Sequence, residues 1–183
     1  MARDDLLVWI DLEMTGLDPS RCTIVEIATL VTDAQLELVA EGPNIIIQTS
    51  DEDLSTMDDF VRNMHTRSGL LDRIAASDVT LEQAEAQTLD FLREQVVERS
   101  SPLCGNSIWK DRQFLERYMP TLDAHLHYRC IDVSTIKELG RRWYPDRPRP
   151  PAKQETHRAL DDIRESIEEL RHYRAHLFVN DAP

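Results

Sequence analysis

Two acidic residues, Asp11 and Glu13, end an apolar, β-prone segment that covers residues 7–13. Side chains alternate between the two faces of a strand, so a strand here would point both carboxylates in one direction. Paired carboxylates at the end of a buried strand repel each other and resist desolvation, and a divalent cation would neutralise them. The alternative is a strand end that exposes two ordinary acids to solvent. We therefore take the pair as a candidate metal site.

Three further acids and a histidine extend this candidate site. Asp111 opens an expected helix after a Gly-Asn-Ser loop, although the helix dipole would also favour a purely structural acid there. His157 precedes Asp161 and Asp162 in the last expected helix, and the apolar stripe of that helix does not choose between the two acids. Asp161 suits a solvated helix acid. For a single histidine near a helix start, a surface position is the commoner case.

As a set, these residues could support hydrolysis of a phosphodiester bond. Four carboxylates can hold two Mg²⁺ or Mn²⁺ ions about 4 Å apart, which orient a water molecule and offset the charge that develops at phosphorus. A histidine that binds neither ion has an ordinary pKa near 6.5, so it could accept the proton of that water at neutral pH.

The elements that must position these residues indicate a mixed α/β sheet flanked by helices. Period-two apolar runs and turn residues predict an antiparallel meander first, with a turn at 41–44. The expected strands cover 7–13, 23–31, 36–39, 45–48, 103–107 and 128–133. The expected helices cover 53–64, 68–76, a longer one opened by a cap at Thr80, 110–118, 134–143 and 156–178. The Pro- and Arg-rich stretch 144–153 is expected to be a loop rather than a domain linker.

Composition sets limits on the function. The chain has 183 residues, which suits a single domain spanning 1–183. Its net charge of −13 argues against a passive binder of long nucleic acid, which normally presents a basic surface, and favours a short substrate reached through metal ions. We find no export or membrane signal, and three scattered cysteines (Cys22, Cys104, Cys130) suit a reducing compartment, so we expect a cytoplasmic protein.

Several longer motifs carry a resemblance to a known family. They run in order along nearly the whole chain: Trp9-Ile-Asp-Leu-Glu-Met-Thr-Gly-Leu17, Ile24-Val-Glu-Ile-Ala28, Gly105-Asn-Ser-Ile108, Asp111-Arg112, Tyr128-Arg-x-x-Asp-Val-Ser134 and His157-Arg-Ala-Leu-Asp-Asp-Ile163. The sequence resembles the four-acid (DEDD) 3′-to-5′ exonuclease superfamily, in its histidine branch, and within that branch the oligoribonucleases. The His-x-x-x-x-Asp spacing of that branch selects Asp162 over Asp161.

The resemblance implies a ribonuclease H-like (DnaQ-like) exonuclease domain with two divalent cations, Mg²⁺ or Mn²⁺. It implies that Asp11 bridges both ions, that Glu13 and Asp162 complete one site, and that Asp111 serves the other. His157 would be the general base. The implied reaction is 3′-to-5′ hydrolysis of very short RNA, chiefly dinucleotides and including pGpG, to 5′-mononucleotides.

The resemblance also implies a pocket for a short substrate in a homodimer. Leu17 would wedge against the bases and His65 would stack on one. Ser107, Arg129 and Ser134 would bind the 5′-phosphate, and Tyr128 would reach the site of the second protomer. Structural roles stay open for these residues: Leu17 in a turn, Tyr128 and Arg129 at a strand edge, Ser134 as a helix cap.

Three other functions compete with this interpretation. The four acids and the histidine also fit a general or DNA-directed 3′-to-5′ exonuclease, which the Tyr-Arg-x-x-Asp-Val-Ser stretch disfavours. A non-catalytic nucleotide sensor would have no need for a proton acceptor such as His157. An acidic interaction domain would not gain stability from Mn²⁺.

Overall fold

Five strands form one mixed sheet in the computed structural model, which describes residues 2–151 and 158–178. Their order in the sheet is β3-β2-β1-β4-β5. The bounds are β1 (Leu7–Met14), β2 (Ile24–Thr32), β3 (Leu38–Ile46), β4 (Pro102–Gly105) and β5 (His127–Asp132). The first three strands pair antiparallel, whereas β4 runs parallel to both β1 and β5. The expected mixed sheet is therefore present.

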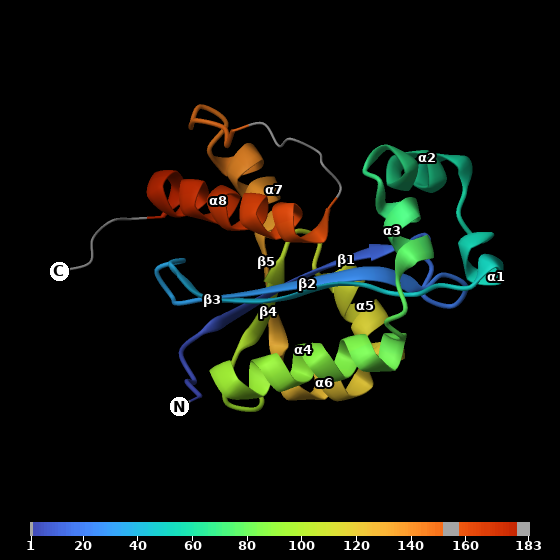
Figure 1. Cartoon of the computed structure of the whole chain (residues 1–183). Helices are drawn as coiled ribbons and strands as arrows, with labels where there is room; N and C mark the ends of the chain where they lie inside the picture. The colour runs from blue at the N-terminus through green and yellow to red at the C-terminus, as the bar shows by residue number, and fades with distance from the viewer. Residues whose placement is uncertain (1, 152–157, 179–183) are drawn as a thin grey trace.

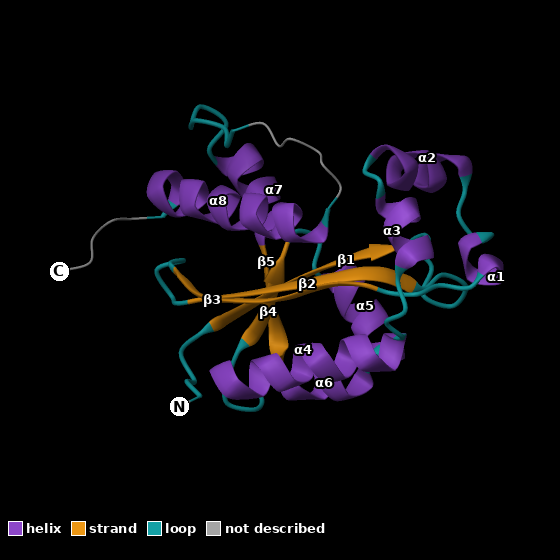
Figure 2. Ribbon diagram, viewed as in Figure 1, coloured by secondary structure: helices purple, strands orange, loops and turns teal. Residues whose placement is uncertain are grey.

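Helices cover both faces of this sheet (Figures 1 and 2). On one face lie α7 (Val133–Trp143) and α8 (Ala159–Leu177). The other face carries α4 (Leu81–Gln95), α5 (Trp109–Tyr118) and α6 (Pro120–His125). Beyond the carboxyl end of β1 lie α1 (Asp51–Leu54), α2 (Asp59–Arg67) and α3 (Leu70–Ala76). No helix of the described ranges is long and apolar enough to cross a membrane.

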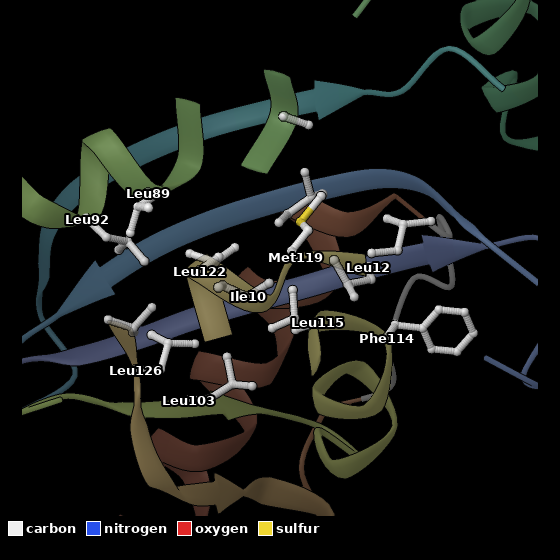
Figure 3. Packing of buried hydrophobic residues seen from close by; sticks show 14 of the residues in the cluster. Ile10, Leu12, Leu89, Leu92, Leu103, Phe114, Leu115, Met119, Leu122 and Leu126 are labelled. Carbon is white, nitrogen blue, oxygen red and sulfur yellow. The ribbon is translucent and has the colours of Figure 1, made fainter. Parts of the chain in front are cut away.

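Strand β1 shows how the core directs the acids. Val8, Ile10 and Leu12 point into the apolar cluster formed with α4, α5 and α6, part of which is seen in Figure 3. Trp9 belongs instead to the cluster formed with α8. Because side chains alternate along a strand, Asp11 and Glu13 continue the side of Trp9 and face the α8 layer.

The predicted turn at 41–44 is wrong, because these residues lie inside β3 and the turn comes earlier, at 33–37. Pro43 lacks an N–H, but β3 is an edge strand whose pairing with β2 shifts register here, so the loss is tolerated. At Gly42, a Cβ atom would lie 2.5 Å from the ring of Phe91, so this close approach requires glycine. The glycine and proline therefore serve packing and an irregular edge rather than a turn.

The helical region departs from the prediction in two places. The helix expected over 53–64 is broken into α1 and α2, because Asp58 accepts a hydrogen bond from the N–H of Val61 and caps a new helix. Helix α6 was not predicted, since Pro120 suggested a stop, whereas proline at a first helical position starts the helix. The capping box at Thr80 is present at the start of α4.

Candidate active site

Three of the predicted acids converge at the carboxyl end of β1. Asp11 and Glu13 come from β1, and Asp162 comes from the first turn of α8. One carboxylate oxygen from each lies within 4.8 Å of the others. Neighbouring Asp161 is about half exposed and lies 3.8 Å from Arg164, away from the cluster. The packing of α8 on the sheet therefore distinguishes the two adjacent acids.

Asp111 lies next to this cluster but outside the group of three. It is buried in the first turn of α5, and its Oδ1 accepts a hydrogen bond of 3.1 Å from the backbone N–H of Leu12. Burial raises the pKa of Asp111 to about 7, and the charge of Asp132 acts in the same direction. This hydrogen bond attaches the start of α5 to β1 beside Glu13.

The pKa of Glu13 is shifted far from its ordinary value. Burial raises its pKa to about 9, and the charges of Asp162, Glu26 and Asp111 add to the rise. A hard divalent cation would stabilise the ionised form of these carboxylates. Their donor atoms are all oxygens, which such cations prefer. The residues present therefore fit Mg²⁺ or Mn²⁺.

A buried ion pair, which sequence reasoning missed, supports the cluster from behind. The guanidinium of Arg158 binds Glu26 of β2 through two hydrogen bonds, of 2.8 and 3.1 Å. Glu26 is fully buried and stands opposite Glu13 in the β1–β2 register. The carbonyl of Arg158 accepts the N–H of Asp162 at 3.0 Å. Arg158 thereby joins the start of α8 to the sheet.

His157, the predicted general base, lies outside the described residues. Its neighbour Arg158 is the described residue closest to it in sequence, and the ion pair with Glu26 holds that residue beside Glu13. The role of His157 stays a prediction.

His65, which is predicted to stack on a base, is buried in this structure. The ring is fully buried at the end of β1, with Nε2 at 2.9 Å from the carbonyl oxygen of Met14 and Nδ1 at 3.8 Å from Glu13. A ring enclosed in this way offers no face to a base unless α2 shifts. The periodicity of α2 did not reveal this burial, because it depends on how the helix sits against the end of β1.

Leu17 occupies the loop between β1 and β2 and is 69% exposed. It lines a cavity of about 320 Å³ together with residues of the same loop and of the α1–α2 connection. An exposed leucine in the loop that follows the strand of Asp11 and Glu13 offers an apolar surface, as the predicted contact with bases would need.

The two predicted phosphate-binding serines lie together at the carboxyl ends of β4 and β5. Ser107 has a left-handed φ of +52° and its N–H donates to Ser134 Oγ at 2.8 Å and to Asp132 at 2.9 Å. The hydroxyls of Ser107 and Ser134 are 3.2 Å apart, and Ser134 donates to Asn106 at 3.0 Å. These serines line an open cavity of about 370 Å³.

Asn106 was also missed as an organising residue. Its amide donates to Ser166 at 2.8 Å and to the buried carboxylate of Glu169 at 3.2 Å, both on α8. The signal in the sequence was its place in the Gly105-Asn-Ser-Ile108 motif, which did not indicate these contacts with α8.

Tyr128 and Arg129 lie on β5, the edge strand opposite β3. Tyr128 is 73% exposed, and the Arg129 guanidinium stands 5.4 Å from the centre of its ring. Neither lines the cavity beside Ser107 and Ser134. The contact of Arg129 with the 5′-phosphate and that of Tyr128 with the second protomer's site therefore stay predictions.

Comparison with known proteins agrees with this geometry. Residues 8–170 match the Exonuclease family. The chain is 56% identical to the oligoribonuclease of Escherichia coli K12 over 175 residues, which cover 96% of this chain and 97% of that protein. It is 58% identical to the oligoribonuclease of Aeromonas hydrophila over 172 residues, covering 94% and 95% of the two chains.

Solved structures confirm the predicted exonuclease fold. E. coli exonuclease I in complex with a dA16 oligonucleotide superposes with a TM-score of 0.72 at 14% identity, over 94% of this chain and 41% of that one. Exonuclease I from Methylocaldum szegediense gives 0.67 at 19% identity, over 93% and 40%. The chain thus spans about two fifths of the length of these neighbours. Identities this low bear on the fold alone.

The match to the family over most of the chain and the high identity to full-length relatives confirm the predicted resemblance. The chain belongs to the exonuclease family and, within it, to the oligoribonucleases, which are 3′-to-5′ exoribonucleases acting on short RNA.

Proposed function

We propose that this oligoribonuclease finishes RNA degradation by hydrolysing dinucleotides, including pGpG, to 5′-mononucleotides with two divalent cations, Mg²⁺ or Mn²⁺. The observation that carries the proposal is the convergence of Asp11, Glu13 and Asp162 within 4.8 Å, from a strand and a helix that are about 150 residues apart in sequence. Free thiols at all three cysteines are consistent with a cytoplasmic enzyme, which is part of the proposal.

Each catalytic residue has a proposed task. Asp11, Glu13 and Asp162 would hold one cation, and Asp111 together with Asp11 would hold the other. When bound, the cations supply a polarised water and offset charge on the scissile phosphate. His157 accepts the proton of that water on a ring nitrogen. Arg158, through Glu26, keeps the adjoining chain beside Glu13.

The proposed substrate pocket selects for length. Leu17 contacts the bases, and His65 supports Glu13 from beneath or stacks on a base after α2 moves. Ser107 and Ser134 bind the 5′-phosphate together with Arg129. A binding group for the terminal phosphate one dinucleotide away from the cluster would favour the shortest RNA, and the net charge of −13 disfavours longer RNA.

The proposed enzyme is a homodimer in which Tyr128 completes the site of its partner. Support comes from the large exposure of this ring on edge strand β5, since aromatic side chains with an apolar body and a polar tip are enriched at protein interfaces.

The test is a time course on a 5′-labelled RNA dinucleotide and a heptamer, with Mn²⁺ or EDTA. Asp162→Ala should lose activity, whereas Asp161→Ala is the matched control, since it removes the same charge one residue away at an exposed position. Fast, metal-dependent cleavage of the dinucleotide with much slower cleavage of the heptamer is expected. Equal rates on both lengths would point to a general exonuclease, to be tested on DNA, and no cleavage by the folded protein would point to a nucleotide sensor.

A further inference from the structure

A cavity outside the candidate active site lies between α7, α8 and the loop that follows α7. Its volume is about 180 Å³. The lining residues come from α7, from the loop that follows it and from α8, and they include Lys137, Arg141, Tyr144, Arg147, Arg149 and Tyr173. On α8, Tyr173 and Leu177 lie 11 and 15 residues beyond Asp162, so the cavity is roughly 16–22 Å along the helix from the acid cluster.

The loop that walls this cavity is held in place by hydrogen bonds. The carbonyl oxygen of Pro148 lies 2.8 Å from Nε2 of His172 on α8. The N–H of Arg147 donates to the carbonyl of Tyr144 at 3.1 Å, and that of Tyr144 donates to Gly140 on α7 at 2.9 Å. The loop is therefore attached to both helices, and the cavity has defined walls.

The charge of the cavity contrasts with that of the whole chain. Four cations line it, although the chain carries a net charge of −13. Lys137 pairs with Glu169 at 3.2 Å, and Arg141 pairs with Glu138 at 3.1 Å. Among residues 2–151 and 158–178, no carboxylate forms an ion pair with Arg147 or Arg149. Two guanidiniums that have no ion-pair partner among the described residues favour an anion, and their planar forks suit phosphate.

The remaining wall is apolar and suits a planar ring. Three prolines, Leu177 and the tyrosine rings supply it. A cavity of this size is smaller than the ~300–1,000 Å³ of sites that enclose drug-sized ligands, so it fits the base of one nucleotide rather than a whole dinucleotide. A mononucleotide, which has one planar base and one phosphate, meets both requirements.

We propose that this cavity is a second site, which binds a nucleoside 5′-monophosphate with its base against the proline and tyrosine wall and its phosphate on Arg147 and Arg149. The choice of ligand rests on the proposed function, because that reaction releases 5′-mononucleotides from the same chain. The path Lys137–Glu169–Asn106–Ser134 connects the cavity to the serines of the substrate pocket. A product bound in the cavity therefore lies at one end of a chain of polar contacts that reaches the substrate pocket.

The test counts AMP equivalents by equilibrium dialysis with radiolabelled AMP in EDTA, on the full-length protein. Arg147→Ala/Arg149→Ala should lose one equivalent, with affinity reduced about a hundredfold, or about tenfold for each arginine. The matched control, Arg73→Ala/Arg93→Ala, removes the same charge from exposed positions on α3 and α4 and should bind as the wild type does. The variant Arg129→Ala/Ser134→Ala, which is altered in the substrate pocket, should still bind the one AMP per chain that depends on Arg147 and Arg149.

The nature of the ligand is tested by competition with adenosine and inorganic phosphate, each of which should compete at least tenfold less well than AMP. Unchanged stoichiometry in Arg147→Ala/Arg149→Ala would overturn the site, and equal competition by inorganic phosphate would overturn the nucleotide assignment. Dinucleotide turnover in Mn²⁺ is measured on the wild type and on the same variants in a separate assay. A wild-type protein that binds AMP at this site but cleaves no dinucleotide would refute the proposed function and leave the second site intact.

Discussion

The ion pair between Arg158 and Glu26 allows a quantitative test of what holds the catalytic end of α8. Glu26 is fully buried, the Arg158 side chain is 18% exposed, and the two groups form a bidentate contact. Removing one partner of a buried pair costs about 3–5 kcal/mol, because the other charge stays buried without compensation. Since Arg158 retains some solvent contact, we expect Arg158→Met to lose about 3 kcal/mol, at the lower end of that range.

The assay is thermal unfolding of the metal-free protein, monitored by circular dichroism. For a chain of 150–250 residues, each kcal/mol shifts Tm by about 2–4 °C, so the expected fall is about 6–12 °C. Arg164→Met is the matched control, because its pair with Glu41 at 3.0 Å is half exposed on both sides. Exposed pairs contribute about 0–1 kcal/mol, and the control should fall by no more than about 4 °C.

A double variant separates the loss of the ion pair from the cost of leaving one charge buried without a partner. Glu26→Met/Arg158→Met removes both charges and keeps apolar volume, so its Tm should lie above that of Arg158→Met. Turnover should fall in both variants, since the side chain of residue 158 no longer anchors to Glu26 the segment whose main-chain carbonyl accepts the N–H of Asp162. If Arg158→Met unfolds within 4 °C of the wild type, the pair contributes no more than a surface contact and the reasoning fails.

Three further outcomes are expected. Mn²⁺ at about 100 times its Kd should stabilise the fold by about 2.7 kcal/mol and raise Tm by about 5–11 °C, an effect that Asp11→Ala should largely abolish and Asp161→Ala should retain, as measured by calorimetry. Arg129→Ala should slow cleavage of 5′-phosphorylated dinucleotides more than that of longer RNA, and equal losses in rate assays on both lengths would contradict the phosphate-binding role. Burial lowers the pKa of His125 below its ordinary 6.5, so the unfolded chain binds the proton first as the pH falls. The free energy of unfolding therefore keeps the full contribution of neutral His125 above pH 6.5 and loses it as the pH falls below that value. Between pH 7.5 and 5.5, the free energy of unfolding in urea should change less for His125→Gln than for the wild type.

Much of the fold and of the candidate site follows from local sequence patterns. The alternation along residues 7–13 was enough to direct Asp11 and Glu13 to one face, because the period of a strand is fixed by its backbone. The capping box at Thr80 likewise defined the start of α4. The ordered motifs indicated the family before any coordinates, since each combines several residues at set separations.

Other features depended on packing between distant segments. Asp161 and Asp162 are neighbours with the same chemistry, and only the seating of α8 on the sheet turns one toward β1 and the other toward Arg164. The burial of His65 reflects how α2 closes against the end of β1. Gly42 and Pro43 resembled a turn, but the edge of the sheet and the Phe91 ring made them part of a strand.

The sequence by itself therefore determined which residues could do chemistry and which face of each element they share. The tertiary structure decided which of them meet, as in the pairing of Glu26 with Arg158 across 132 residues and the path from Lys137 through Glu169 to Asn106. The physical reason is that backbone periodicity is a local property readable from neighbouring residues, whereas a contact between distant side chains depends on how whole layers pack.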